Sequence, residues 1–191
     1  MFPPLAHRTV RWRPVQGEGL EHLTLVPGSD TNSPAFRAES VVIGAADGVA
    51  YGARYMVEGR ADWTVSALCV ENTAGHRLSL RSDQPGRWTD EHGHPCPDFD
   101  GLIDIDLSAT PFTNTLPIRR LGLTTGMPAS DIAVLYIPFD TLRPHAHHQR
   151  YTCLKDGRLY RFEVADGSFA ADLPVDADGL VLDYPELFRR L

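Results

Sequence analysis

Cysteine is scarce in this sequence. The 191 residues include three, Cys69, Cys96 and Cys153. An odd number cannot all pair within one chain, and no two stand in a Cys-x-x-Cys spacing, which argues against a disulfide framework and against a structural zinc site. We therefore expect reduced thiols, as is usual for a protein of the cytoplasm.

Long apolar runs are also lacking. No stretch approaches the roughly 18 residues that a membrane-spanning helix requires. The first eight residues, Met1–Arg8, contain no apolar segment typical of a signal peptide. These absences predict a cytoplasmic protein without a transmembrane segment.

The chain has no excess of positive charge. Its 18 basic and 25 acidic residues give a formal net charge of −7, and the only adjacent pairs of basic residues are Arg119-Arg120 and Arg189-Arg190. Nucleic acids and anionic membranes bind clustered basic side chains, so neither is an expected partner. The length and the 42% of hydrophobic residues predict one domain over residues 1–191.

Motifs of nucleophilic catalysis and of phosphate binding are absent as well. The sequence contains no Gly-x-Ser-x-Gly, Ser-x-x-Lys or His-Glu-x-x-His motif and no glycine-rich phosphate loop. We therefore predict no catalytic residue and no cofactor, and an enzyme is the less favoured class of protein.

The sequence does contain turn signals that are typical of a β protein. Asp-Gly occurs at Asp47-Gly48, Asp156-Gly157, Asp166-Gly167 and Asp178-Gly179. Between two strands, Asp-Gly favours a type I′ hairpin turn, which needs a positive φ at both central residues. The last three lie close together, which predicts a meander near the C-terminus.

Apolar and polar residues alternate with period two in the segments between these turns. The expected inward faces contain Val10 and Trp12; Tyr51, Ala53, Tyr55 and Val57; Trp63, Val65, Ala67 and Cys69; Tyr160, Phe162 and Val164; and Phe169, Ala171, Leu173 and Val175.

Other segments depart from this alternation. Ile132–Ile137 is apolar on both faces, so the sheet, a helix or a second subunit must cover both. Ser82–Asp100 is the expected irregular loop, and a short turn is expected at Pro185–Leu191.

One segment, Asn114–Leu121, carries the signals of a helix. Thr113 or Asn114 is the expected N-cap, arginines occupy the last turn, and Gly122 follows the helix. Pro117 lies in the first turn. Residues 116, 118 and 121 would then be buried.

The densest chemical pattern is Asp104-Ile105-Asp106. In a strand, the two aspartates share one face, about 7 Å apart. They could act as acid and base on a glycosidic bond or help to bind a divalent cation. Because Arg119 and Arg120 follow closely and a buried unpaired charge is costly, a structural ion network is the favoured interpretation.

Histidines occur in two groups that could supply zinc ligands. Both groups lie in proline-containing sequence typical of exposed loops, so no metal site is predicted. The groups are His92, His94, Cys96 and Asp98, and His145, His147 and His148.

The run from Asp104 to Leu121 resembles a motif of one bacterial family, described as putative glycolipid-binding and of unknown function. Gln149-Arg150-Tyr151, the run from Asp176 to Val181, and Tyr184-Pro185 follow in the same order. Looser similarity at Gly17-Glu18, Trp63 and Gly86-Arg87-Trp88 extends the resemblance over nearly the whole chain.

The chain departs from the family pattern at two places. Leu102 stands where a cysteine is frequent, and Thr64 where an arginine is frequent. No role resting on that thiol or that cation is therefore expected.

The resemblance implies a mainly β fold, a spiral β-roll in which a long antiparallel sheet winds around a single helix, assembled as a homodimer. The family's suggested role rests on a likeness in shape to bacterial lipoprotein carriers.

The leading hypothesis is a non-enzymatic protein that binds a glycolipid or a similar amphiphile in a hydrophobic cavity or a dimer groove. Aromatic residues would form walls or stacking faces, and polar residues would hold the head group. The candidate ligand-binding residues are Trp63, Trp88, Asp104, Asp106, Thr113, Asn114, Arg119, Arg120, Gln149, Arg150 and Tyr151. The alternatives are a hydrolase acting on a sugar conjugate through Asp104 and Asp106, and a purely structural or interaction module.

Overall fold

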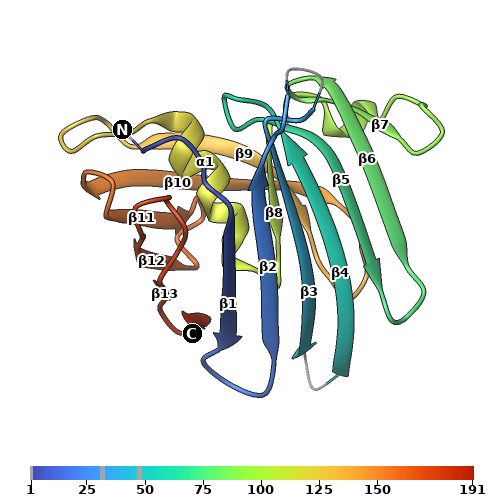
Figure 1. The fold of residues 1–191 in the computed structure, drawn as a ribbon, viewed down its shortest axis with the longest axis horizontal. Coiled ribbons are helices and arrows are strands. Elements are labelled where there is room, and N and C mark those ends of the chain that lie inside the picture. Colours follow the sequence, from blue (N-terminus) through green and yellow to red (C-terminus); the bar gives the residue numbers. More distant parts are fainter. Residues whose placement is uncertain (1, 31–32, 47–48) are drawn as a thin grey trace.

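The computed structural model describes residues 2–30, 33–46 and 49–191, and strands dominate it (Figure 1). The larger of two sheets has nine strands in the order β13-β14-β1-β2-β3-β4-β5-β6-β7, each antiparallel to its neighbours. These strands are β1 (Arg8–Pro14), β2 (Leu20–Pro27), β3 (Phe36–Ala46), β4 (Val49–Gly59), β5 (Val65–Asn72), β6 (Arg77–Gln84), β7 (Arg87–Asp90), β13 (Asp183–Tyr184) and β14 (Phe188–Arg190).

The smaller sheet has five strands in the order β12-β11-β10-β9-β8. Its strands are β8 (Asp104–Leu107), β9 (Ser130–Ile137), β10 (His145–Lys155), β11 (Leu159–Val164) and β12 (Ala170–Pro174). The pair of β8 and β9 is parallel, whereas the other pairs are antiparallel.

Helix α1 (Thr115–Leu121) continues a 3-10 turn, Pro111–Asn114, and a second 3-10 turn spans Pro97–Phe99. Leu116 packs into the core of the larger sheet, and Ile118 packs into the core of the smaller sheet. The predicted mainly β fold, with an antiparallel sheet wrapped around one helix, is confirmed for the described residues, although the strands divide into two sheets. None of the described helices is both long and apolar enough to cross a membrane.

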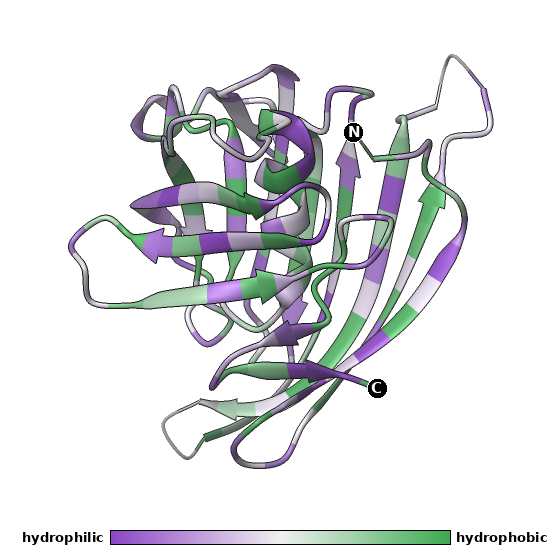
Figure 2. Cartoon of the chain, turned by 90° about the vertical axis from the view of Figure 1, so that its left-hand side faces the viewer, coloured by the Kyte–Doolittle hydropathy of each residue, from purple (hydrophilic) through white to green (hydrophobic). Residues whose placement is uncertain are grey.

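Alternation with period two builds both cores, and Figure 2 shows green and purple residues alternating along the strands. Val10 and Trp12 of β1 lie in the core of the larger sheet, together with Tyr55 and Val57 of β4. The predicted faces of β11 and β12 line the core of the smaller sheet. The period-two prediction is therefore confirmed for these strands.

In the second half of β5, the residues that face the core are not the predicted ones. Val65 pairs with Gly59 and Ala67 with Glu58, so Ser66 is an extra residue in a β-bulge. Beyond the bulge, Leu68 and Val70 face the core, which places Ala67 and Cys69 on the opposite face.

The Asp-Gly turns join the strands as predicted, but their turn type is wrong. Asp156-Gly157 connects β10 to β11, and Asp166-Gly167 connects β11 to β12, which confirms the meander. Asp178-Gly179 lies between the bridged residues Val175 and Val181. Only the glycines of these turns have a positive φ, whereas a type I′ turn needs two such residues. The loop after Lys155 has three residues rather than two, and such loops need a single left-handed position. Asp47-Gly48 lies outside the described residues.

The helix ends as predicted and begins at Thr115, and a capped 3-10 turn, Pro111–Asn114, precedes it. Gly122 adopts the left-handed conformation, with φ +58°. At the other end, the Oγ1 of Thr110 accepts a 3.0 Å hydrogen bond from the backbone N–H of Phe112, so the cap precedes Pro111. Asn114 forms no side-chain cap. Of the residues expected to be buried, Leu116 and Ile118 are, and Leu121 is partly buried.

Both faces of β9 are covered within the chain. Leu135 and Ile137 pack into the core of the larger sheet, Ile132 packs against the core of the smaller sheet, and Val134 is buried. A second subunit is therefore not required to cover this strand.

Two expected irregular segments are more regular than predicted. Phe188–Arg190 forms β14 and pairs with β1, so only residues 185–187 of the expected C-terminal turn are a turn. Within Ser82–Asp100, β6 continues to Gln84 and β7 pairs with it. Backbone hydrogen bonding to a neighbouring strand explains both differences.

Candidate functional site

The motif from Asp104 to Leu121 forms a buried polar cluster between α1 and β8. Arg120 donates from Nε to Oδ1 of Asp104 at 3.0 Å and from Nη2 to Oδ2 at 2.5 Å. Asp104 is 1% exposed. Burial raises the pKa of Asp104, and the hydrogen bonds from Arg120 oppose that rise. The predicted ion pair between Asp104 and Arg120 is present.

Asp106 differs from Asp104 because no arginine contacts it through a hydrogen bond or ion pair among the described residues. It accepts a 3.0 Å hydrogen bond from Thr113 Oγ1 and a 2.7 Å hydrogen bond from Gln149 Nε2. Burial raises the pKa of Asp106, and these two hydrogen bonds oppose the rise. The predicted network with two arginines is therefore wrong for this residue.

The same cluster includes Asn114 and Tyr151. The Tyr151 hydroxyl donates a 2.9 Å hydrogen bond to Oδ1 of Asn114, whose Nδ2 donates to the carbonyl of Pro111 at 3.3 Å. These side chains satisfy one another and hold α1 against the smaller sheet. Their arrangement favours a supporting role over contact with a ligand.

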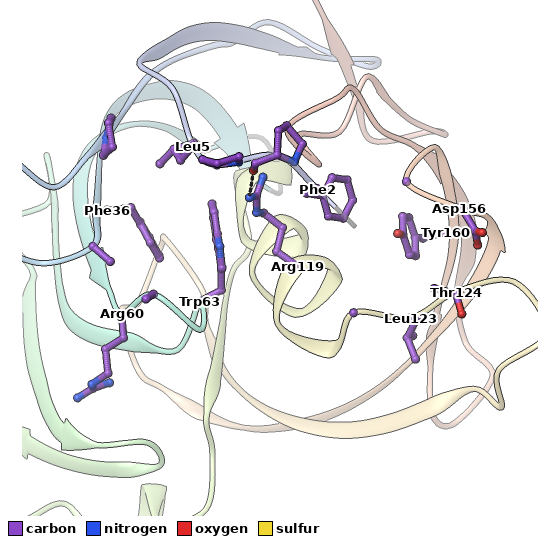
Figure 3. Close-up of a pocket in the computed structure, with 17 residues that line it drawn as sticks. Phe2, Leu5, Phe36, Arg60, Trp63, Arg119, Leu123, Thr124, Asp156 and Tyr160 are labelled. Atoms are coloured by element: carbon purple, nitrogen blue, oxygen red, sulfur yellow. Dashed lines mark hydrogen bonds between the residues drawn. The ribbon is translucent and has the colours of Figure 1, made fainter.

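Arg119, next to Arg120, lies apart from this cluster in the wall of a cavity of about 600 Å³ (Figure 3). Its Cζ lies 4.2 Å from the ring centroid of Trp63 and 5.1 Å from that of Phe2. Its Nη1 donates to the carbonyl of Asp178 at 2.7 Å, and its Nη2 donates to the carbonyl of Pro3 at 2.8 Å. Burial lowers the pKa of Arg119, and its buried Nε has no hydrogen-bond partner among the described residues.

Trp63 reaches this position from a strained turn. Its φ is +68°, a left-handed conformation that costs a bulky residue about 1–3 kcal/mol. The N–H of Trp63 donates to the carbonyl of Arg60 at 2.9 Å, and Asp62 Oδ1 accepts from the N–H and the hydroxyl of Thr64. Backbone strain of this kind is concentrated at ligand-binding and active sites.

A row of flat side chains crosses the cavity. Phe36 stacks on Trp63 with centroids 4.6 Å apart, Arg119 follows, and Phe2 lies beyond it, 6.3 Å from Tyr160 (Figure 3). Leu5 and Leu123 add apolar walls. The cavity therefore combines a cation held between aromatic rings with mainly apolar surroundings.

The remaining candidate residues do not join this cavity. Trp88 is buried in the core of the larger sheet, where its Nε1 donates to the carbonyl of Leu102 at 2.8 Å. Arg150 is exposed and pairs with Asp131 at 2.7 Å. Among the eleven candidates, only Trp63 and Arg119 line the cavity.

The two histidine groups occupy different settings. His145, His147 and His148 lie on β10, so the expected loop location is wrong for them, because the segment pairs along its length with β9. His94 accompanies Asp90 in a turn, with a 3.2 Å contact between Nδ1 and Oδ2. The described residues contain no group of three or more His, Cys, Asp or Glu side chains placed to hold a metal ion.

Sequence analysis missed most of the cavity. Phe2, Phe36 and Tyr160 come from distant segments, and nothing in the local sequence marks them as neighbours. It also missed Glu21, which is 2% exposed. Here a signal exists, because Glu21 shares the inward face of β2 with Leu23 and Leu25, and a carboxylate on an apolar face is unusual.

Comparison with known proteins agrees with this fold. The model of the family described as "Putative glycolipid-binding" matches residues 9–190. The crystal structure of a DUF1089 family protein from Pseudomonas aeruginosa is similar, with a TM-score of 0.77 and 40% sequence identity over 90% of this chain and 92% of that chain. No curated protein matches the chain. The resemblance found in the sequence is confirmed, and the chain belongs to the putative glycolipid-binding family.

Proposed function

We propose that the protein binds a glycolipid or a similar amphiphile in the cavity beside Arg119, without catalysing a reaction. One observation carries the proposal: a half-buried arginine, held between aromatic rings, lies in a mainly apolar cavity and forms no ion pair with any described residue, although Asp178 and Asp176 act on it electrostatically. The family description supports the same class of ligand.

Several N–H donors of Arg119 form no hydrogen bond within the described residues. A guanidinium carries five N–H donors, and those of Arg119 make two hydrogen bonds, both to backbone carbonyls. No ion pair involves Arg119 among the described residues. A ligand oxygen that reached the free donors would form charge-assisted hydrogen bonds, which are stronger than neutral ones.

The rest of the cavity suits a hydrocarbon chain. Leu5, Phe36, Leu123 and Tyr160 line it, and its volume lies within the range of roughly 300–1,000 Å³ found for small-molecule sites. Each buried CH₂ group contributes about 0.8 kcal/mol, so the tail of an amphiphile would supply most of the affinity.

This geometry changes the roles expected for two groups of residues. Trp63 has Phe36 on one face and Arg119 on the other, so it serves as a wall and not as a stacking platform for a sugar. Asp104 and its neighbours fix α1, the helix that carries Arg119, and so position the cation. They do not line the cavity themselves, and this favours binding over hydrolysis by Asp104 and Asp106.

The proposal is tested with a series of glycolipids that differ only in acyl-chain length. We expect the affinity to rise by up to about fourfold for each CH₂ added, until the cavity is filled. Arg119→Gln should weaken binding about tenfold or more, because charged hydrogen bonds are lost. Arg150→Gln, which removes an exposed arginine, is the matched control and should bind like the parent protein. Native mass spectrometry and calorimetry measure both effects. Affinity that does not depend on chain length would refute the proposal, as would an unchanged Arg119→Gln variant.

We also propose that the chain is one domain and that it acts as a cytoplasmic homodimer. The resemblance to the family supports the dimer, and the three free cysteines suit a reducing compartment. Sedimentation velocity over a range of concentrations tests assembly, and a monomer at all concentrations would contradict the dimer.

A further inference from the structure

A second cavity, of about 320 Å³, lies at the opposite end of β2 from the Arg119 cavity. Residues at the start of β2 line it, together with the ends of β1 and β3 and the segments that follow β8 and β9. In Figure 1 these strand ends lie at the bottom, whereas the end of β2 and the start of β3 lie at the top. Those two ends contain Pro27 and Phe36, which line the Arg119 cavity.

Glu21 is the buried charged group of this second cavity. Its Oε1 accepts three hydrogen bonds, from Tyr55 at 2.6 Å, from Thr110 at 2.8 Å and from Ser40 at 2.9 Å. Its Oε2 is buried and has no partner among the described residues. Three donors on one oxygen hold the carboxyl group in place and leave the other oxygen unsatisfied, which is costly unless a ligand supplies a donor.

The charges around the cavity all have one sign. Glu18 and Asp140 line it in addition to Glu21, and no lysine, arginine or histidine in the described part of the chain does. The basic groups adjoin the cavity from outside. His76 Nδ1 lies 3.2 Å from the carbonyl oxygen of Asp140, and the rings of His145 and His147 lie 5.2 and 5.5 Å from that of Tyr136. Arg190, whose Cζ lies 6.0 Å from the ring centroid of Trp12, pairs with Asp176. The cavity therefore lacks an internal cation for Glu21.

Aromatic rings complete the lining. Tyr51, Tyr136, Phe139 and Phe188 lie around the cavity, and Phe139 makes edge contacts with the rings of Tyr51 and Tyr55. Aromatic faces attract cations, by about 2 kcal/mol or more where water is excluded.

We propose that this cavity is a separate binding site for a small organic cation, a primary ammonium group on a compact apolar body, with Glu21 as its counter-ion. The three carboxylates and the absence of basic lining residues favour a cation over a neutral sugar. The aromatic lining favours an organic ammonium ion over a hydrated metal ion, which requires several oxygen ligands.

The ionisation of Glu21 should make binding at this site depend on pH. Burial raises the pKa of Glu21 to about 7. The other ionisable groups around Glu21 are Tyr55, which donates to it, and the lining residues Tyr51, Tyr136, Glu18 and Asp140. His76 lies against Asp140, and His145 and His147 lie against Tyr136, so these three histidines are the basic groups next to the lining. Because an ammonium ion binds the ionised carboxylate, its affinity should rise with pH through about 7.

The test compares benzylamine with benzyl alcohol, which has a similar shape but no charge at neutral pH. We expect benzylamine to bind at least tenfold more tightly at pH 8, and its affinity to fall about tenfold between pH 8 and pH 6 while that of the alcohol stays constant. Glu21→Gln should abolish the preference for the amine. Glu18→Gln, which removes an exposed carboxylate at the rim, should reduce it only slightly.

Several outcomes would overturn the proposal: equal binding of the amine and the alcohol, no binding of either at millimolar concentration, or a Glu21→Gln variant that binds benzylamine as the parent protein does. If Glu21→Gln does not fold, the pH profile of the parent protein decides the matter. Arg119→Gln should leave benzylamine binding unchanged, so that failure of one site is distinguishable from failure of the other.

Discussion

At the scale of single residues, the pair of Asp104 and Arg120 makes the sharpest stability prediction. Asp104→Asn leaves the largely buried guanidinium of Arg120 without its counter-charge, and breaking a buried pair in this way costs about 3–5 kcal/mol. We expect a loss of about 3 kcal/mol in the free energy of unfolding, measured in urea. Asp131→Asn breaks an exposed pair with Arg150 and should cost less than about 1 kcal/mol. Equal losses for the two variants would contradict a structural role for Asp104.

A second prediction at this scale concerns Glu21 and the dependence of stability on pH. Its pKa is about 7 in the folded chain, compared with 4.5 for a free glutamate. Between these values the folded state binds more protons than the unfolded state, so stability falls as pH rises and becomes constant above about pH 7. The difference corresponds to about 3 kcal/mol.

Because burial also raises the pKa values of Asp104 and Asp106, the quantity to measure is the difference between the parent protein and Glu21→Gln. We expect the variant to gain stability relative to the parent as pH rises from 4.5 to 7. A constant difference over this range would show that Glu21 has an ordinary pKa.

At the scale of secondary-structure elements, the end of β4 shapes the Arg119 cavity. A Cβ added at Gly59 would lie 2.2 Å from the ring of Phe36. Gly59→Ala therefore has to displace Phe36 from Trp63, at a cost of about 1–3 kcal/mol in stability. We expect weaker binding of amphiphiles as well.

Gly52→Ala, on the same strand, is the control for Gly59→Ala. Its added Cβ would meet only the side chain of Thr73, with Cγ2 at 3.0 Å and Oγ1 at 3.8 Å, and that exposed side chain can move. Urea unfolding and amphiphile titration should separate the two variants, and identical behaviour would argue against a role for Phe36 in the cavity.

The strands and the helix show how far local pattern predicts structure. Alternation identified the inward faces of β1, β4, β11 and β12, because burial of one face imposes a period of two. It failed at Ser66, since a bulge depends on how β5 pairs with β4 and not on the residues of β5 alone. The helix end at Gly122 was predictable from a single residue, whereas the 3-10 turn that precedes the helix, Pro111–Asn114, depends on a cap, Thr110, that is also bound to Glu21.

At the scale of the whole molecule, the candidate site was mostly beyond sequence analysis. The cavity side chains Phe2, Phe36, Trp63, Arg119 and Tyr160 come from five segments spread over the chain. Only the folding of two sheets around α1 brings them together. Trp63 and Arg119 were identified because they belong to motifs that resemble a family. Phe2, Phe36 and Tyr160 belong to no such motif.

The whole molecule also predicts that its two cavities act independently. They lie at opposite ends of β2, whose eight residues span about 25 Å, and a continuous core that includes Leu23 and Leu25 fills the space between. None of the side chains that the structure describes lines both cavities. Sites separated by more than about 10 Å without shared partners behave additively within about 0.5 kcal/mol. Saturating benzylamine should therefore change the affinity for an amphiphile by no more than about twofold.

The double variant Arg119→Gln with Glu21→Gln tests the same independence without ligands. Its loss of stability should equal the sum of the two single losses within about 0.5 kcal/mol, measured in urea at one pH. Thr110 provides a continuous connection to examine, because it caps the turn that leads into α1 and also donates to Glu21. A larger coupling, present in the parent background and lost in Thr110→Val, would mean that the state of Glu21 is transmitted through this turn to Arg119. Additivity in both backgrounds is the outcome that the separation of the cavities predicts.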